Sequence, residues 1–241
     1  TLLSTHLNPE FETKLLVGRR DPQEKDAGYI AREQGVTPIE ITEMRRSILP
    51  LNDIKAYFKI KKIIRQYKPD IVHTHASKSG AIGRLAASSC KVKVIVHTFH
   101  GHVFHSYFSP LKTKIFIEIE KYLAKKSTAI VTISDLQKQE ICNQFKICSP
   151  EKAHVIPLGF DLSRFRDKQE EKRKQFREKY NLTDDTIAVG IVGRLVPVKN
   201  HPFFLQAMAE VFKTTNKKVV AILVGDGEER KNLESECIRL G

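Results

Sequence analysis

Short apolar stretches alternate with amphipathic segments along most of the chain. Four of the stretches have the length and composition of strands: Asp70–His75, Val92–Phe99, Thr128–Ile133 and Ile187–Val192. A regular alternation of strands and helical segments indicates an α/β fold built on parallel sheets. Ile187–Val192 is apolar at almost every position, so we expect this strand to be buried on both faces.

Two segments between the strands carry apolar residues at helical spacing. Asn52 is a suitable N-cap for a helix that runs to Tyr67, and Pro69 follows its end. Its apolar stripe consists of Ile60, Ile63, Ile64 and Tyr67. The second segment, Leu111–Lys125, predicts a helix whose inward-facing residues are Ile115, Ile119, Tyr122 and Leu123.

The remaining predicted elements are shorter. They are strands at Thr13–Gly18, Val36–Ile41 and His154–Ile156 and a helix of small residues at Gly80–Ser89. Ser134 and Gln137 have the spacing of a capping box, which places a helix start directly after the strand that ends at Ile133.

The composition changes after Pro157, where a highly charged segment with few apolar residues begins. We therefore expect an N-terminal domain at residues 1–165, a linker at 166–184 and the start of a second domain at 185–241. Only two strand–helix units follow the linker, about half of a usual doubly wound domain. Because the chain also begins at Thr1 without a methionine, we expect a fragment that is inactive by itself.

Composition narrows the class of protein. With 41% hydrophobic and 29% charged residues, the 241-residue chain is globular. We find no apolar run near the roughly 18 residues of a membrane-spanning helix, and no signal peptide. The four cysteines lack zinc-ligand spacing, which indicates reduced thiols in a cytoplasmic protein.

The net charge of +13 suggests an anionic partner: nucleic acid, a membrane surface or a phosphorylated substrate. Lysines cluster on two predicted helices: Lys55, Lys59 and Lys62 on one, and Lys112, Lys114, Lys121 and Lys125 on the other. We expect these faces to bind anionic membranes from the cytoplasmic side. A nucleic-acid-binding module is an alternative, but the chain has no Trp and no stripe of aromatics among its cations.

The loop after Ile187–Val192 combines features of an anion site. Gly193 ends the strand, Arg194 and Lys199 follow it, and Asn200 is a suitable N-cap for a helix beginning near Pro202. Cations at the carboxyl end of a strand, beside a helix N-terminus, suit a diphosphate.

Six of the nine histidines lie between His73 and His105. A metal site is one interpretation, but no HExxH or His–carboxylate spacing supports it, and strand alternation alone places His73 and His75 on one face. We expect no metal. His73 and His97 are predicted to be hydrogen-bonded locally.

The loops after the two histidine-containing strands predict a crevice, because ligands of open α/β sheets bind at the carboxyl ends of strands. His75 ends the first strand, and His100 follows the second. The residues offered to this crevice are Lys78, Gly80, His100, Gly101 and His102.

Six motifs in order resemble those of GT4-type glycosyltransferases, which have the GT-B fold and act in bacterial polysaccharide and lipid-glycan assembly. The motifs are DIVHTHASKSGAIGRLAA, VIVHTFHGHVF, VTISD, IPLGFD, GRLVPVKN and LVGDGEER. Leu158 replaces the usual Asn of the fourth motif. The E-x7-E motif that contacts the donor would lie beyond Gly241.

The resemblance implies two Rossmann-like domains facing a cleft, with the first missing its start and the second incomplete. It implies transfer of a sugar, with retention, from a nucleotide-diphosphate donor to a glycan or lipid-linked acceptor. His100 corresponds to the catalytic-loop histidine, and Arg194 and Lys199, after Gly193, correspond to the diphosphate-binding cations. No metal or other cofactor is expected, and the location is cytoplasmic or peripheral on the inner face of the plasma membrane. A GT-B-type sugar-nucleotide epimerase is the alternative with the same fold.

Overall fold

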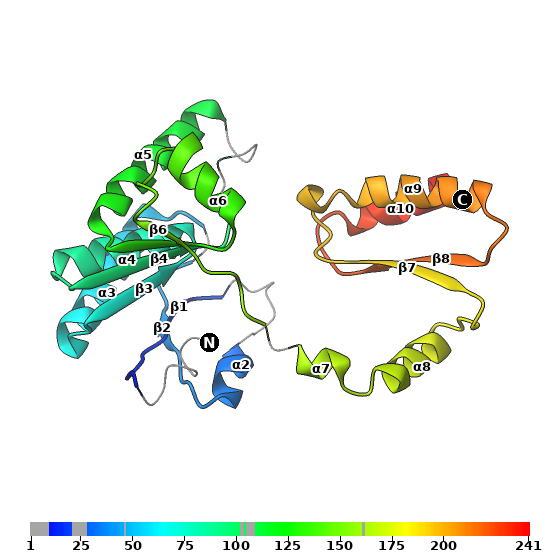
Figure 1. Ribbon diagram of the computed structural model, residues 1–241, viewed down its shortest axis with the longest axis horizontal. Helices are drawn as coiled ribbons and strands as arrows, with labels where there is room; N and C mark the ends of the chain where they lie inside the picture. Colours follow the sequence, from blue (N-terminus) through cyan, green and yellow to red (C-terminus); the bar gives the residue numbers. More distant parts are fainter. Residues whose placement is uncertain (1–9, 21–27, 46, 102–103, 105–108, 161) are drawn as a thin grey trace. The chain divides into compact units, whose positions relative to one another are not determined.

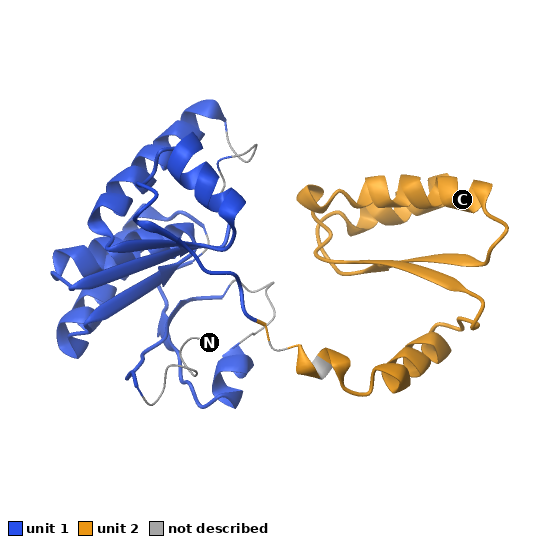
Figure 2. Cartoon of the chain, viewed as in Figure 1, with its two compact units in different colours: residues 1–159 blue, residues 160–241 orange. Residues whose placement is uncertain are grey.

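A computed structural model describes residues 10–20, 28–45, 47–101, 104, 109–160 and 162–241. The chain divides into two compact units, Thr1–Gly159 and Phe160–Gly241 (Figure 2). Each unit combines helices with parallel strands, which confirms the predicted α/β class. The division lies shortly before the boundary predicted at residue 165, and the segment predicted as a linker belongs to the second unit.

The first unit contains a two-stranded and a four-stranded sheet, both parallel (Figure 1). Its elements are β1 (Leu16–Gly18), α2 (Gly28–Glu33), β2 (Ile39–Ile41), α3 (Pro50–Tyr67), β3 (Ile71–His75), α4 (Ser77–Ser89), β4 (Val94–Phe99), α5 (Pro110–Lys126), β5 (Ala129–Thr132), α6 (Asp135–Gln139), the π-helical turn η1 (Glu140–Gln144) and β6 (Ala153–Val155). The four-stranded sheet has the order β3-β4-β5-β6, so each connection steps in the same direction. Right-handed crossovers therefore place α4, α5 and α6 on one face of that sheet.

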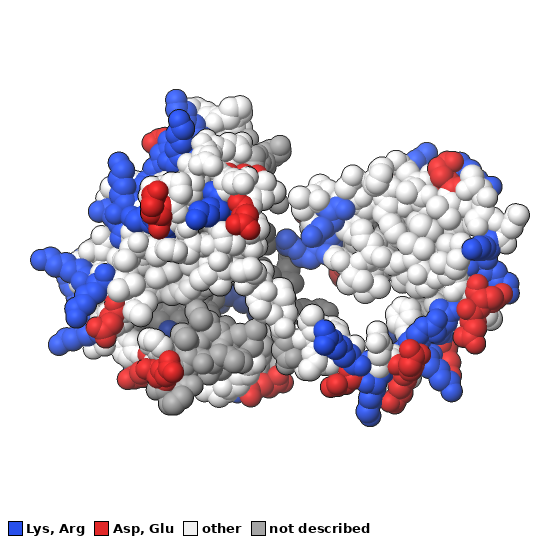
Figure 3. Space-filling view, viewed as in Figure 1, with Lys and Arg blue, Asp and Glu red and all other residues white. Residues whose placement is uncertain are grey.

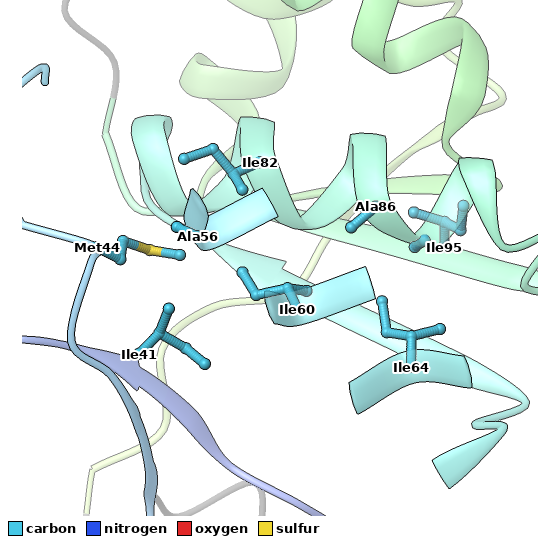
Figure 4. Packing of buried hydrophobic residues seen from close by; sticks show 9 residues of the cluster. Ile41, Met44, Ala56, Ile60, Ile64, Ile82, Ala86 and Ile95 are labelled. Carbon is cyan, nitrogen blue, oxygen red and sulfur yellow. The ribbon is translucent and has the colours of Figure 1, made fainter. Parts of the chain in front are cut away.

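Two apolar clusters fill the first unit. The first joins β2, α3, α4 and β4, and Figure 4 shows its isoleucines pointing toward one another: Ile41, Ile60, Ile64, Ile82 and Ile95. Burial of Ile60 and Ile64 confirms the stripe predicted on α3. The second cluster joins β4, β5, α5 and η1 through Phe99, Ala124, Ile130 and Ile141.

Two predicted helix starts in the first unit have different outcomes. Ser134 is the N-cap of α6, as predicted, and its Oγ accepts the backbone N–H of Gln137 at 3.2 Å. The predicted cap at Asn52 is wrong, because α3 begins at Pro50. Proline suits a first helical position, and the carboxylate of Asp53 accepts the backbone N–H of Leu49 at 3.1 Å.

The predicted inward face of α5 is correct only for Leu123, which is 1% exposed. Ile115, Ile119 and Tyr122 are exposed by 52%, 43% and 53%. The buried face consists of Glu120, Leu123 and Ala124 instead. A buried carboxylate needs a partner, and an ion pair with Arg84 of α4 directs Glu120 inward. The apolar stripe is consequently left on the surface.

The second unit is built on one pair of parallel strands, β7 and β8. Its elements are α7 (Ser163–Arg166), α8 (Gln169–Lys179), β7 (Ile187–Val192), the 3-10 turn η2 (Pro197–Lys199), α9 (His201–Thr214), β8 (Val219–Val224) and α10 (Arg230–Leu240). Helices α9 and α10 cover one face of the strands (Figure 1). The prediction that Ile187–Val192 is buried on both faces is wrong, since Ile187 is 43% and Val192 79% exposed. Within the described residues the opposite face of this sheet carries no comparable helix layer.

Candidate functional site

Three histidines lie in a row toward the carboxyl-terminal edge of the four-stranded sheet. We call His73, His75 and His100 the histidine column. Strands β3 and β4 are paired with His75 opposite Thr98. Alternation along each strand therefore sends His73, His75 and Thr98 to one face and Thr74 and His97 to the other. The contact of His100 with His75 places His100 on the first of these faces. The helices α4 and α5 lie on the second face, so the column occupies the face without them.

Hydrogen bonds and ring contacts join the histidine column. Nδ1 of His75 lies 2.9 Å from Nε2 of His100, and their rings are stacked with centroids 5.2 Å apart. The ring of His73 lies 4.4 Å behind that of His75, and its Nε2 is 2.7 Å from Oγ1 of Thr98. Burial, with the neighbouring histidines, lowers the pKa of His75 to about 4, and burial also lowers the pKa of His73. Both rings are therefore uncharged at neutral pH.

The turn that follows His75 is backbone-strained. Ala76 has φ 59° and ψ 160°, a conformation that is normally restricted to glycine. Strain of this kind costs on the order of 1–3 kcal/mol and persists only where the surrounding structure determines it. The start of α4 at Ser77 and the hydrogen bond from Oγ of Ser79 to the carbonyl of His75 provide that restraint.

Gly80, which the sequence predicts to be a crevice residue, instead packs against the sheet face that α4 covers. Gly80 lies inside α4 and is buried, and a Cβ added to it would overlap Cε1 of His97. His97 is 1% exposed, and its Nδ1 lies 2.9 Å from Oγ1 of Thr74. The local hydrogen bonding predicted for His97 is confirmed. Gly80 thus provides room for a buried imidazole, and its position in the helix interior separates it from the exposed His100.

The other predicted crevice residues are placed differently from one another. Nζ of Lys78 donates to the carbonyls of Arg45 and Ser47 and forms an ion pair with Asp53. Lys78 therefore holds the segment before α3. Gly101 is exposed directly after His100, while His102 lies outside the described residues.

In the second unit, the loops after β7 and β8 are joined backbone to backbone. The N–H of Gly193 donates to the carbonyl of Val224 at 2.9 Å, and that of Leu195 to the carbonyl of Asp226 at 3.0 Å. A Cβ on Gly225 would overlap the carbonyl oxygen of Gly193, and one on Gly227 that of Leu195. These two glycines of the LVGDGEER motif therefore permit the close packing that fixes the first loop.

This packed loop presents Arg194 and Lys199 to solvent. Both residues are exposed, and neither has a carboxylate partner in the part of the chain that the structure describes. Cε of Lys199 lies 3.9 Å from the position of a Cβ on Gly193, so the lysine stem passes over the glycine. Asn200 is the N-cap residue of α9, as predicted, although its side chain makes no cap hydrogen bond. The three predicted donor-site residues thus lie together at the carboxyl edge of β7.

The described residues contain neither a metal-binding cluster nor a membrane-spanning helix. Over the described residues, no group of three or more His, Cys, Asp and Glu side chains is arranged to hold a metal ion. Among those same residues no helix is long and apolar enough to cross a membrane.

Sequence reasoning missed two features of the site. The contact of His75 with His100 depends on the β3–β4 register, and the motif strings alone do not contain it. The packing role of Gly225 and Gly227 was also missed, although a Gly-x-Gly directly after a strand was the available signal.

Comparison with known proteins identifies both units. Residues 3–164 match the family described as Glycosyltransferase Family 4, and residues 172–241 match Glycosyl transferases group 1. The chain is 31% identical to the UDP-Gal:alpha-D-GlcNAc-diphosphoundecaprenol alpha-1,3-galactosyltransferase of Escherichia coli over 94% of its own length and 57% of that relative.

Solved structures show the fold. HepE of Anabaena in complex with UDP and glucose superposes with a TM-score of 0.72 at 19% identity, over 94% of this chain and 58% of that one. The UDP-GlcNAc 2-epimerase of Neisseria meningitidis bound to UDP-GlcNAc superposes with a TM-score of 0.65 at 12% identity, over 99% and 63%. The likeness is to the GT-B fold, and the chain spans little more than half the length of these relatives. The chain belongs to Glycosyltransferase Family 4.

Proposed function

We propose that the protein transfers a sugar from a nucleotide-diphosphate donor and that its second unit holds the donor diphosphate. The observation that carries this proposal is the loop after β7, where two exposed cations with no carboxylate partner among the described residues lie beside a glycine. The guanidinium of Arg194 suits a two-pronged grip on phosphate oxygens, and Lys199 adds a point charge. Together they would offset the negative charge that develops on the leaving diphosphate.

The proposal includes retention at the anomeric carbon and independence of metal. A metal-independent enzyme must neutralise the diphosphate with its own side chains, and Arg194 and Lys199 are the candidates. His100 would orient the transferred sugar, since it is exposed at a strand end where ligands of α/β sheets bind. The E. coli relative and HepE both have UDP or a UDP-sugar in their names, which supports a nucleotide-sugar donor.

We further propose a lipid-linked acceptor at an anionic membrane surface on the cytoplasmic side. The name of the E. coli relative includes a diphosphoundecaprenol acceptor. The outward face of α5 suits such a surface, because its exposed stripe lies in an apolar groove shared with α4: Leu85, Leu111, Ile115, Ile119 and Tyr122. Figure 3 shows cationic side chains over the part of the first unit where α5 lies.

The arrangement of lysines favours a membrane over a neutral partner for this face. At 3.6 residues per turn, Lys114, Lys121 and Lys125 flank one side of the α5 stripe and Lys112 the other. Nζ of Lys126 lies over the ring of Tyr122, within the stripe. Glu118 is the acidic residue among them, and it is paired with Lys121 at 2.7 Å. Helix α3 has a similar outer face, with Leu51, Ile54 and Phe58 exposed near Lys55 and Lys62. Each cation near an anionic surface contributes about 1 kcal/mol.

Product analysis tests the transfer reaction. The full-length protein is incubated with radiolabelled UDP-, GDP- and ADP-sugars in the presence and absence of a lipid-diphosphate acceptor. Acceptor-dependent release of nucleoside diphosphate without added metal is the expected result. Conversion of the donor sugar in the absence of acceptor would instead support a GT-B-type epimerase, the alternative consistent with the structural similarity to the Neisseria enzyme.

A further inference from the structure

We propose that His75 is a positioning residue that fixes the ring of His100 through the hydrogen bond between the two imidazoles. The proposal rests on the role of His100 in sugar transfer proposed above. His75 ends β3, whereas His100 belongs to the loop after β4, so the contact links two segments 25 residues apart in sequence.

The geometry supports a rigid chain of contacts that ends at His100. Thr98 is held within β4, and its Oγ1 lies 2.7 Å from Nε2 of His73. His73 packs behind His75, and His75 both stacks on His100 and lies within hydrogen-bonding distance of it. His100 itself is exposed and follows the last residue of β4, so its backbone alone does not define the direction of its ring.

The backbone of His75 is independently restrained. The residue is paired in β3, and the next residue, Ala76, has the strained backbone conformation described above. Oγ of Ser79 donates to the carbonyl of His75 at 2.8 Å. A side chain anchored in this way can hold a neighbour that belongs to a loop.

The contact also couples the tautomer of His100 to that of His75. One of the two facing nitrogens must carry a hydrogen and the other must be bare for a hydrogen bond to form. If Nε2 of His100 donates, its Nδ1 is left as an acceptor. If Nε2 accepts, Nδ1 carries the hydrogen and becomes a donor. The tautomer of His75 therefore sets whether the free nitrogen of His100 accepts from or donates to a sugar hydroxyl.

Two variants separate the hydrogen bond from the ring contact. His75→Phe keeps a ring for stacking but removes the hydrogen bond. His75→Asn keeps a polar atom close to the position of Nδ1. His154→Phe is the matched control, because His154 is exposed on β6 and belongs to no part of the proposed site.

The first measurement uses this chain labelled with ¹⁵N-histidine. We expect His75→Phe to change the ¹⁵N shifts of Nδ1 and Nε2 of His100, and His75→Asn and His154→Phe to leave them close to the parent values. The second measurement is the rate of sugar transfer by the full-length protein. In this assay His75→Phe should lower kcat about five- to tenfold with little change in donor KM, and His75→Asn should keep most of the parent rate.

Unchanged His100 shifts in His75→Phe would overturn the positioning role, whatever the rates. Changed shifts with normal turnover in His75→Phe, in an enzyme inactivated by His100→Ala, would also overturn it. If His100→Ala transfers sugar at the parent rate, the proposed function of His100 fails, and the positioning role fails with it. That last result is distinguished from the others because it appears in the His100 variant.

Discussion

Nη2 of Arg84 donates to both carboxylate oxygens of Glu120, at 3.0 and 2.8 Å, and so joins α4 to α5 inside the first unit. Arg84 is 0% and Glu120 6% exposed. Nε of Arg84 donates to the carbonyl of Gly80 at 3.0 Å, while its Nη1 is buried without a partner in the described structure. The ion pair lies on the buried side of α5, and the apolar stripe of that helix lies on the exposed side.

Removal of one partner should therefore be more damaging than removal of both. We expect Glu120→Leu to lower the free energy of unfolding by about 3–5 kcal/mol, because Arg84 would remain buried and unpaired. The double variant Arg84→Met/Glu120→Leu should lose clearly less. Urea unfolding of the chain measures both variants against the parent. Glu118→Gln is the control, since its exposed pair with Lys121 should contribute less than about 1 kcal/mol. Equal losses in the single and double variants would contradict the prediction.

The buried His97 should make the stability of the first unit depend on pH. Burial, with Arg84 nearby, lowers the pKa of His97 to about 2, below its value in the unfolded chain. The unfolded chain therefore takes up a proton that the native protein does not, as the pH falls below about 6.5. The stabilisation is full above that pH and is lost as the pH falls from about 6.5 toward 2, by up to about 1.4 kcal/mol per pH unit.

Unfolding by urea at pH 7, 6 and 5 tests this dependence. His73 and His75 act in the same direction, because their pKa values are also lowered. The informative quantity is consequently the difference in slope between the parent and His97→Asn, in which the titrating ring is absent. We expect the parent to lose stability more steeply below pH 6, and parallel slopes would refute the assignment to His97.

Gly80→Ala should destabilise the first unit. The added Cβ would overlap Cε1 of His97 and lie 2.9 Å from its Nδ1, and the ring is held by Thr74. Overpacking of this kind costs about 1–3 kcal/mol. Gly159→Ala is the control, since a Cβ there meets no atom within 4 Å. Thermal unfolding compares the two variants, and an unchanged Tm for Gly80→Ala would show that His97 can move aside.

Arg194→Ala and Lys199→Ala should weaken nucleoside-diphosphate binding. A charge-assisted hydrogen bond contributes about 1.5–3 kcal/mol, which corresponds to roughly 10- to 150-fold in affinity. Nucleoside monophosphates should lose less, because the phosphate nearest the sugar is the one gripped. In the full-length protein, either alanine variant should lower kcat/KM on the order of a hundredfold. Arg194→Lys should keep only part of the activity that Arg194→Ala loses.

Calorimetry with UDP and UMP, repeated with guanine and adenine nucleotides, measures these affinities. Lys213→Ala is the matched control, because Lys213 lies near the opposite end of α9 from Lys199 and is paired with Glu210. If a nucleotide binds and both alanine variants keep the parent diphosphate affinity, the loop after β7 is not the diphosphate site.

The outward face of α5 should bind anionic vesicles. We expect cosedimentation with phosphatidylglycerol-containing liposomes at low salt and little with neutral ones, because both burial of the stripe and lysine–lipid attraction are needed. Ile115→Ser/Ile119→Ser should reduce binding to the anionic vesicles, and Lys112→Gln/Lys114→Gln/Lys125→Gln should remove the preference for anionic lipid. Ile238→Ser, which is 84% exposed on α10, is the control. Equal binding to neutral and anionic vesicles would rule out the electrostatic component.

The order and type of the main elements follow from local patterns in the sequence. Strand alternation and helical periodicity depend on near neighbours in the chain, which is why β3, α4, β4, α5, β5, α6 and β7 were predicted close to their observed places. The same local signals placed Gly193, Arg194 and Lys199 at a strand end and put His73 and His75 on one face. Family membership was equally accessible, because the motifs are continuous strings.

Which side of each element is buried depends on contacts between distant segments. Local periodicity could not show that Glu120 is buried in an ion pair with Arg84 while the apolar stripe of α5 is exposed. It could not show that Gly80 leaves room for the buried ring of His97, or that helices cover only one face of β7. The β3–β4 register, which brings His75 to His100, results from hydrogen bonds between segments more than 20 residues apart. Such contacts depend on the relative positions of distant segments, and a pattern along one segment contains no information about them.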